Sequence, residues 1–126
     1  MKDTLYSARA QAFRNLGRCR LQLFDARGAE EAFMRTLAMQ GRNSIALLEV
    51  AQLRFESEDM RNASIYYDQY RNVVRQQSAR GLWFGVRLAR AQGDKDAEGS
   101  YALALRNLYP QSAEYEAYRR SLQDAD

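Results

Sequence analysis

Residues 44–77 read SIALLEVAQLRFESEDMRNASIYYDQYRNVVRQQ, and this stretch decides the fold. Its first half places apolar side chains at i, i+3, i+6 and i+10, the spacing of one face of an α-helix. Its second half carries another such face, and the polar stretch 56–62 separates the two. The segment therefore predicts two helices joined by a turn, with Asn43 or Ser44 capping the first. The apolar positions are Ile45, Leu48, Ala51 and Phe55, then Ala63, Tyr66, Tyr67, Tyr70 and Val74.

The same pattern recurs without a gap at an offset of 34 residues on both sides of this stretch. Helix backbones approach closely only where side chains are small, so we expect the recurring glycines and alanines at the helix crossings. The recurring aromatic then fills the space towards the neighbouring unit. Four sets of residues, which we call columns, keep one chemical character at this offset: Gly17, Ala51 and Gly85; Ala29, Ala63 and Ala97; Phe33, Tyr67 and Tyr101; and Leu16, Val50 and Phe84.

A 34-residue repeat of two helices resembles the tetratricopeptide repeat (TPR). The residues that match it in the first unit are Phe13, Leu16, Gly17, Ala29, Phe33 and Leu37. The resemblance implies an all-α, TPR-like α-α superhelix that forms a single domain over residues 1–126. Three helix-turn-helix repeats are expected at about 10–43, 44–77 and 78–111, followed by a capping helix over 112–123.

Signals near the end of the chain place the last elements. The third unit turns at Gly93-Asp94, and its second helix ends before Pro110, which lacks a backbone donor. Ser112 can cap the final helix, whose apolar stripe is Tyr115, Tyr118 and Leu122. Nothing equivalent covers the N-terminal side, so we expect either missing earlier repeats or a homodimer that buries this face.

Composition argues against an enzyme. The chain has 126 residues, a formal net charge of +3, one cysteine and no histidine. Histidine-based acid-base catalysis and imidazole metal sites are therefore excluded, and we expect no catalytic residue, no metal and no cofactor. Cys19 is expected to be a packed small residue. The crowded carboxylates of Glu56, Glu58 and Asp59 match no calcium loop and indicate solvated helix ends.

No apolar stretch is long enough to span a membrane, so we expect no direct membrane insertion by this chain. Nearly all of its basic residues are arginines, which leaves an RNA-binding helical repeat as an alternative, although the low net charge speaks against a nucleic-acid partner.

The first helices of stacked pairs line a concave groove, and this groove is the candidate binding site. Its character changes along the repeats from arginine to apolar, which suits a peptide with an acidic end and an apolar end. Trp83 lies off these columns and either anchors an interface or packs on the capping helix. The groove residues expected from the spacing are Arg14, Arg18, Leu21, Leu48, Gln52, Phe55, Leu82 and Val86.

A closer resemblance covers nearly the whole chain. DTLY at 3–6, FRNLG at 13–17, YYDQY at 66–70, GVRLAR at 85–90 and NLYPQSAEYEAY at 107–118 resemble the C-terminal half of the type IV pilus biogenesis/stability protein family, the PilF/PilW-type pilotins. Members of this family are outer-membrane lipoproteins that face the periplasm and help the pilus secretin reach the outer membrane and assemble into a multimer.

The resemblance implies a non-catalytic protein-binding scaffold for fimbrial biogenesis, with the secretin as the suspected partner. It implies a location on the periplasmic side of the outer membrane, with the lipid anchor outside this chain; without the resemblance, a cytoplasmic location would be expected. A generic TPR adaptor for another protein partner is the alternative.

Overall fold

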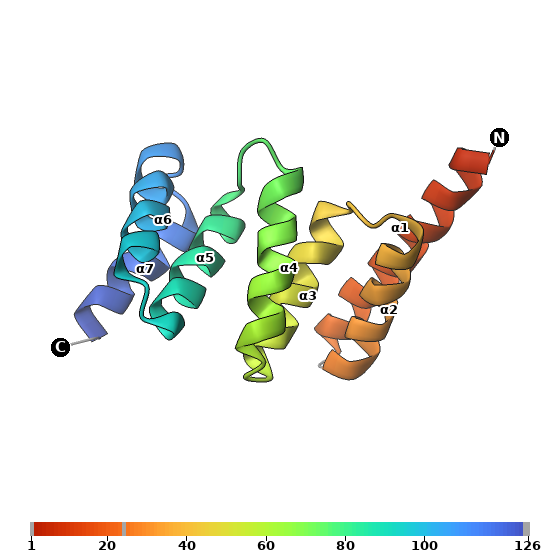
Figure 1. Cartoon of the computed structure of the whole chain (residues 1–126), viewed down its shortest axis with the longest axis horizontal. Coiled ribbons are helices and arrows are strands. Elements are labelled where there is room, and N and C mark those ends of the chain that lie inside the picture. The colour runs from red at the N-terminus through yellow and green to blue at the C-terminus, as the bar shows by residue number, and fades with distance from the viewer. Residues whose placement is uncertain (1, 24, 125–126) are drawn as a thin grey trace. The chain divides into compact units, whose positions relative to one another are not determined.

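The computed structural model describes residues 2–23 and 25–124, and this part of the chain forms seven α-helices and no strand (Figure 1). The predicted all-α, TPR-like architecture is confirmed. The helices are α1 (Lys2–Gln22), α2 (Ala26–Met39), α3 (Ser44–Glu56), α4 (Met60–Val73), α5 (Ala79–Gln92), α6 (Lys95–Leu108) and α7 (Ala113–Asp124).

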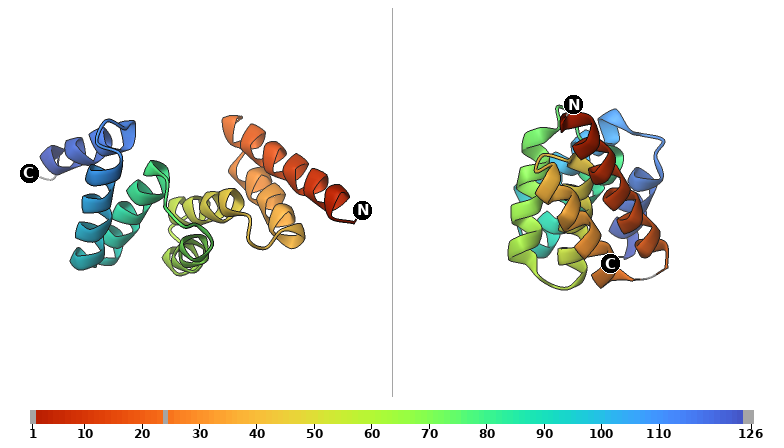
Figure 2. Two further views of the ribbon diagram at one scale, coloured as in Figure 1. Left: turned by 90° about the horizontal axis from the view of Figure 1, so that it is seen from above. Right: turned by 90° about the vertical axis from the view of Figure 1, so that its right-hand side faces the viewer.

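The chain divides into two compact units, residues 1–75 and 76–126. The first unit holds two helix pairs, α1 with α2 and α3 with α4, and α2 also packs on α3. Figure 2 shows α1 and α2 running side by side. Because α2 contacts a helix on each flank, both Ala29 and Phe33 are buried.

The core between α2 and α3 joins one pair to the next. Ala29 and Phe33 of α2 meet three side chains of α3, Ala46, Val50 and Leu53. Burial of an aromatic ring and branched side chains of this size contributes about 1.5–3 kcal/mol for each large side chain. A single pair would leave this surface in water, so packing of α2 on α3 is what stabilises the unit.

The second unit holds the pair α5 and α6, with α7 packed against both. Ser112 accepts a hydrogen bond from the Tyr115 amide at 3.0 Å and so caps α7, as predicted. The rings of Trp83 and Tyr118 meet edge to face with centroids 6.4 Å apart. Of the two readings of Trp83, packing on the capping helix is the one that the structure shows.

Each second helix starts at an aspartate. The side chains of Asp25, Asp59 and Asp94 accept a hydrogen bond from the backbone amide three residues further on. Asn43 does the same for α3 and Ser78 for α5. These caps satisfy backbone donors that a helix cannot satisfy internally.

The caps reveal a register shift that the gap-free repeat did not predict. Asp25 and Asp59 are 34 residues apart, but Asp59 and Asp94 are 35 apart. The amide of each aspartate donates to the carbonyl five residues earlier, which belongs to Arg20, Arg54 and Ala89 in turn. The extra residue lies between α4 and α5, where five residues link the helices, against four between α2 and α3.

The predicted columns are therefore wrong by one residue in the third pair. The positions equivalent to Ala63 and Tyr67 are Glu98 and Ala102. Ala102 is buried like Tyr67, whereas Ala97 and Tyr101 are only half-buried; Glu98 is half-buried as well. Likewise Val86, rather than Gly85, is equivalent to Ala51. One residue rotates a helix position by about 100°, so the shift changes which side chains face the core.

Candidate functional site

The first-helix face of the first unit carries two arginines one helical turn apart. Arg18 is exposed and Arg14 is half-buried on α1. The Nε atom of Arg14 is shielded from solvent and has no hydrogen-bond partner among the described residues. Two guanidinium groups at i and i+4 can both reach one carboxylate, so this part of the predicted groove suits an acidic ligand.

Apolar and amide side chains continue the predicted set on this unit. Leu21 of α1 is half-buried and packs against the core cluster shared by α2 and α3. Gln52 and Phe55 of α3 are half-buried and retain accessible surface. Leu48 is only 6% exposed, so the prediction that it lines an open groove is wrong.

On the second unit the prediction fails because of the register shift. Leu82 and Val86 are 4% and 0% exposed, which places both side chains in the interior rather than on a groove. Counted from the aspartate cap, the positions equivalent to Leu48, Gln52 and Phe55 are Trp83, Arg87 and Arg90. These three keep accessible surface, and Arg90 forms an ion pair with Glu98 at 2.9 Å.

A signal for this correction was present in the sequence. The spacing of Asp25, Asp59 and Asp94, each opening a second helix, already contains the extra residue. The apolar positions alone do not reveal the one-residue shift, because neighbouring positions in α5 are apolar as well.

Charge is distributed unevenly along the first unit. From Thr4 to Phe24 the sequence has four arginines and no acidic residue. The next helix, α2, carries Glu30 and Glu31 in its first half. The side of the unit formed by α1 therefore attracts acidic partners.

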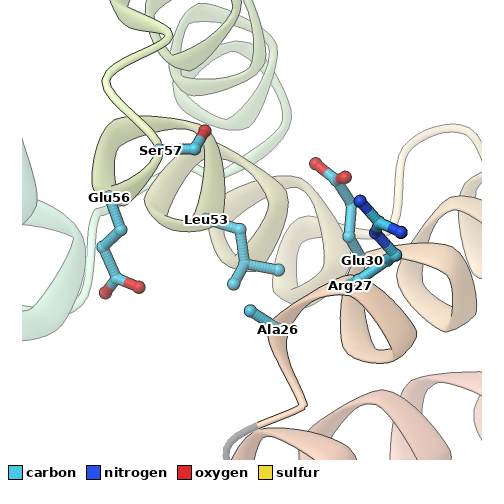
Figure 3. Close-up of a pocket in the computed structure, with 6 residues that line it drawn as sticks. All are labelled: Ala26, Arg27, Glu30, Leu53, Glu56 and Ser57. Carbon is cyan, nitrogen blue, oxygen red and sulfur yellow. The ribbon is translucent and has the colours of Figure 1, made fainter.

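A cavity of about 310 Å³ lies where α2 begins and α3 ends (Figure 3). Leu53 supplies its apolar wall, and Arg27, Glu30 and Glu56 supply charge at the edges. Such a mixed, open hollow suits part of a peptide rather than a buried small molecule. Its lining residues are Ala26, Arg27, Glu30, Leu53, Glu56 and Ser57.

The guanidinium of Arg54 pairs with Glu30, one of the residues that line this cavity. The Nε of Arg54 lies 2.7 Å from Glu30 Oε1, an ion pair rather than a well-aligned hydrogen bond, and its Nη1 lies 3.4 Å from Asp59 Oδ2. Asn62 donates to both oxygens of Asp59, at 2.8 and 3.3 Å. These hydrogen bonds from Asn62, with the nearby charge of Arg54, lower the pKa of Asp59.

Neither a metal-ligand cluster nor a membrane-spanning helix occurs in residues 2–23 and 25–124. No group of three or more His, Cys, Asp or Glu side chains among them is placed to hold a metal ion. Within that same part of the chain, no helix has the length and apolar character needed to cross a bilayer. Cys19 is exposed on α1, so the expectation that it is packed is wrong.

Comparison with known proteins gives a consistent relationship. No family model matches the chain. The type IV pilus assembly protein PilF of Pseudomonas aeruginosa is 36% identical over 118 residues, which are 94% of this chain and 46% of that protein. This chain therefore spans about half the length of the curated relative.

Solved structures agree. The P. aeruginosa PilF structure superimposes with a TM-score of 0.84 at 36% identity, covering 94% of this chain and 53% of the chain in that structure. The structure of PilW, described as a widely conserved type IV pilus biogenesis factor, gives a TM-score of 0.72 at 27% identity over 86% of this chain and 50% of the chain in that structure.

Proposed function

Because this chain is a homologue of the type IV pilus biogenesis proteins PilF and PilW, we propose that it is a non-catalytic TPR scaffold of pilus assembly. Its proposed partner is the pilus secretin, which it helps to reach the outer membrane and to assemble into a multimer. The observation that carries this proposal is the similarity to PilF along 94% of the chain.

The basic first-helix face of the first unit is the proposed contact. Arg14 and Arg18 of α1 would pair with a carboxylate of the partner, and the half-buried Phe55 of α3 would receive an apolar side chain. Paired guanidinium groups favour bidentate contacts with carboxylates, and an aromatic side chain is a frequent anchor of interfaces. A secretin segment with an acidic residue followed by apolar residues has the matching chemistry.

The same similarity supports a proposed location. The scaffold would lie on the periplasmic side of the outer membrane, where a secretin subunit would meet it. The helices described here would then act as the binding part of the scaffold, and attachment to the membrane would depend on elements outside them.

The test uses the source organism with the gene deleted and restored. One strain carries the unaltered gene, one carries Arg14→Glu with Arg18→Glu, and one carries Arg42→Glu with Arg61→Glu. Arg42 and Arg61 are exposed and lie outside α1, so the last strain matches the charge change on other elements of the unit. The readouts are secretin multimers in membrane fractions and co-purification of secretin with the scaffold.

We expect secretin multimers and co-purification of secretin in the strains with the unaltered gene and with the Arg42/Arg61 double variant. We expect both to be lost in the strain with the Arg14/Arg18 double variant. Normal multimers in the deletion strain would contradict the secretin assignment and favour an adaptor for another protein. Equal loss in both double variants would contradict the assignment of the contact to Arg14 and Arg18.

A further inference from the structure

The described residues of the first unit leave a hollow of about 310 Å³ where α2 begins and α3 ends (Figure 3). Two of its lining residues have small side chains: Ala26 is the first residue of α2, and Ser57 directly follows α3. Space therefore remains between the two helix ends. Clefts of this size hold a side chain or a small ligand.

The two helices that form the hollow have their repeat neighbours within this chain. Within the first unit α2 packs on α1 and α3, and α3 packs on α2 and α4. In stacked repeats each unit contacts only the units next to it, so a helix pair in front of α1 would not reach α3. The opening between α2 and α3 therefore does not depend on which residues precede this chain.

Carboxylates outnumber guanidinium groups along the lining. Glu30 and Glu56 line the hollow together with a single arginine, Arg27. Figure 3 shows the two glutamates on either side of Leu53. The chain as a whole has a net charge of +3, so this lining is opposite in sign to the protein that carries it. The hollow therefore attracts a basic side chain and repels an acidic one.

The carboxylate of Glu56 has no counter-charge within the described part of the chain. It is exposed and forms no ion pair with any described residue. Glu30 differs, because its Oε1 atom lies 2.7 Å from Nε of Arg54. Arg54 in turn lies 3.4 Å from Asp59, so its single charge is already shared by two carboxylates. A cation from outside the chain is the ligand that matches Glu56.

The wall between the two glutamates is apolar and fixed in place. Leu53 supplies it and is only 8% exposed, because it packs in the core with Ala29 and Phe33. A long basic side chain lays its methylene groups on such a wall and keeps its charged end beside a carboxylate. Arginine suits this position better than lysine, because a guanidinium is more weakly hydrated and loses less when it leaves water.

We propose that this hollow binds an arginine side chain of another polypeptide. The methylene groups of that arginine lie on Leu53 and Ala26, and its guanidinium pairs with the carboxylate of Glu56. The charge preference of this site is opposite to that of the Arg14/Arg18 face. The site does not depend on the secretin assignment.

The probe is a tripeptide of leucine, arginine and leucine, blocked at both ends and titrated into isotope-labelled protein. NMR spectra are expected to show backbone amide shifts at Ala26, Leu53 and Ser57. These shifts are expected to saturate with a dissociation constant on the order of 1 mM, because a single side chain buries little area. Absence of saturable shifts at these residues would overturn the proposal.

A second peptide tests the charge. Citrulline in place of arginine keeps the size and shape of the side chain but removes its charge. This peptide is expected to bind about tenfold more weakly, because it loses the charge-assisted contact with Glu56. Equal binding of the arginine and citrulline peptides would overturn the proposal.

Three protein variants locate the contact. Glu56→Gln removes the charge with little change in size and is expected to weaken binding of the arginine peptide about two- to fivefold. Glu58→Gln makes the same change at an exposed carboxylate outside the lining, and we expect affinity to change by less than about twofold. Arg27→Gln removes the cation of the lining and is expected to strengthen binding about twofold. Equal weakening by Glu56→Gln and Glu58→Gln would contradict a direct contact.

A fourth variant fills the hollow. Ala26→Phe places a ring in it from an exposed position on α2 and is expected to abolish the peptide-induced shifts. Urea denaturation checks that the variant remains folded. Undiminished binding to the folded variant would overturn the proposal. Self-association of the unaltered protein without peptide, if Glu56→Gln abolished it, would assign the hollow to a second copy of the chain and overturn the proposal as well.

Discussion

The ring of Phe33 lies directly against the backbone of Gly17, so that a Cβ atom added at Gly17 would be 2.8 Å from the ring atoms Cε1 and Cζ. Phe33 is fully buried, so its ring is enclosed by the rest of the unit. This contact joins α1 to α2 at the crossing that the small-residue column predicted. The sequence spacing predicted that the aromatic residue fills the space towards the next helix pair. The structure shows that Phe33 contacts α1 at the crossing and also belongs to the core shared with α3.

Gly17→Ala is therefore expected to destabilise the protein although alanine favours helices. The methyl group would overpack the crossing and cost about 1–3 kcal/mol, which exceeds the helix-propensity gain of about 1 kcal/mol. Gly99→Ala on α6 is the control, because nothing lies within 4 Å of its added Cβ, and it is expected to stabilise by about 0.5–1 kcal/mol. Urea denaturation of both variants measures the difference, and a stabilised Gly17→Ala variant would contradict the close contact.

The register shift is tested by enlarging two alanines that the repeat pattern treats alike. Ala63→Leu is expected to cost about 1–3 kcal/mol, because Ala63 is fully buried at its crossing. Ala97→Leu is expected to change stability by less than about 0.5 kcal/mol, because Ala97 is half-buried and off the crossing in the shifted register. Thermal denaturation of each variant measures the change in stability, and equal destabilisation of the two variants would favour the unshifted register.

The left-handed residues before two of the aspartate caps give opposite expectations. Glu58 has φ 64° and Gly93 has φ 72° at equivalent positions. Glu58→Gly is expected to stabilise by about 0.5–1 kcal/mol, and Gly93→Ala to destabilise by about 1–2 kcal/mol, since side chains disfavour this conformation. Nothing lies within 4 Å of a Cβ added at Gly93, so its effect reports the backbone alone. Chemical denaturation is the measurement, and destabilisation by Glu58→Gly would show that its side chain has a role of its own.

Asp59 makes stability depend on pH in a known direction. Hydrogen bonds from Asn62 and the charge of Arg54 hold its pKa below the ordinary value of 3.8. Its ionised form therefore stabilises the folded state at neutral pH, and this contribution is lost as pH falls below that ordinary value through the lowered one. Asp59→Asn keeps a helix-capping residue but removes the titration. Melting temperatures are expected to differ between the two proteins at pH 7, and the difference is expected to shrink as pH falls below 3.8; a constant difference would contradict the role of ionisation.

Helix content, pairing and most helix ends could be read from the chain itself. Asn43, Ser112 and the turn at Gly93-Asp94 act as predicted. These features are local, because a cap or a left-handed glycine acts within one turn of its own helix. Homology to pilus biogenesis proteins was also detectable, since it depends on residue identities along the chain.

The face of each helix that is exposed was decided by tertiary packing. Leu82 and Val86 were expected on a groove and are buried, because one extra residue between α4 and α5 rotates the helical pattern by about 100°. Cys19 was expected in the interior and is exposed, whereas its equivalent on α3, Leu53, is covered by α2. The same helical periodicity thus occurs in both helices, but only a packed neighbour determines whether an apolar stripe becomes core or surface.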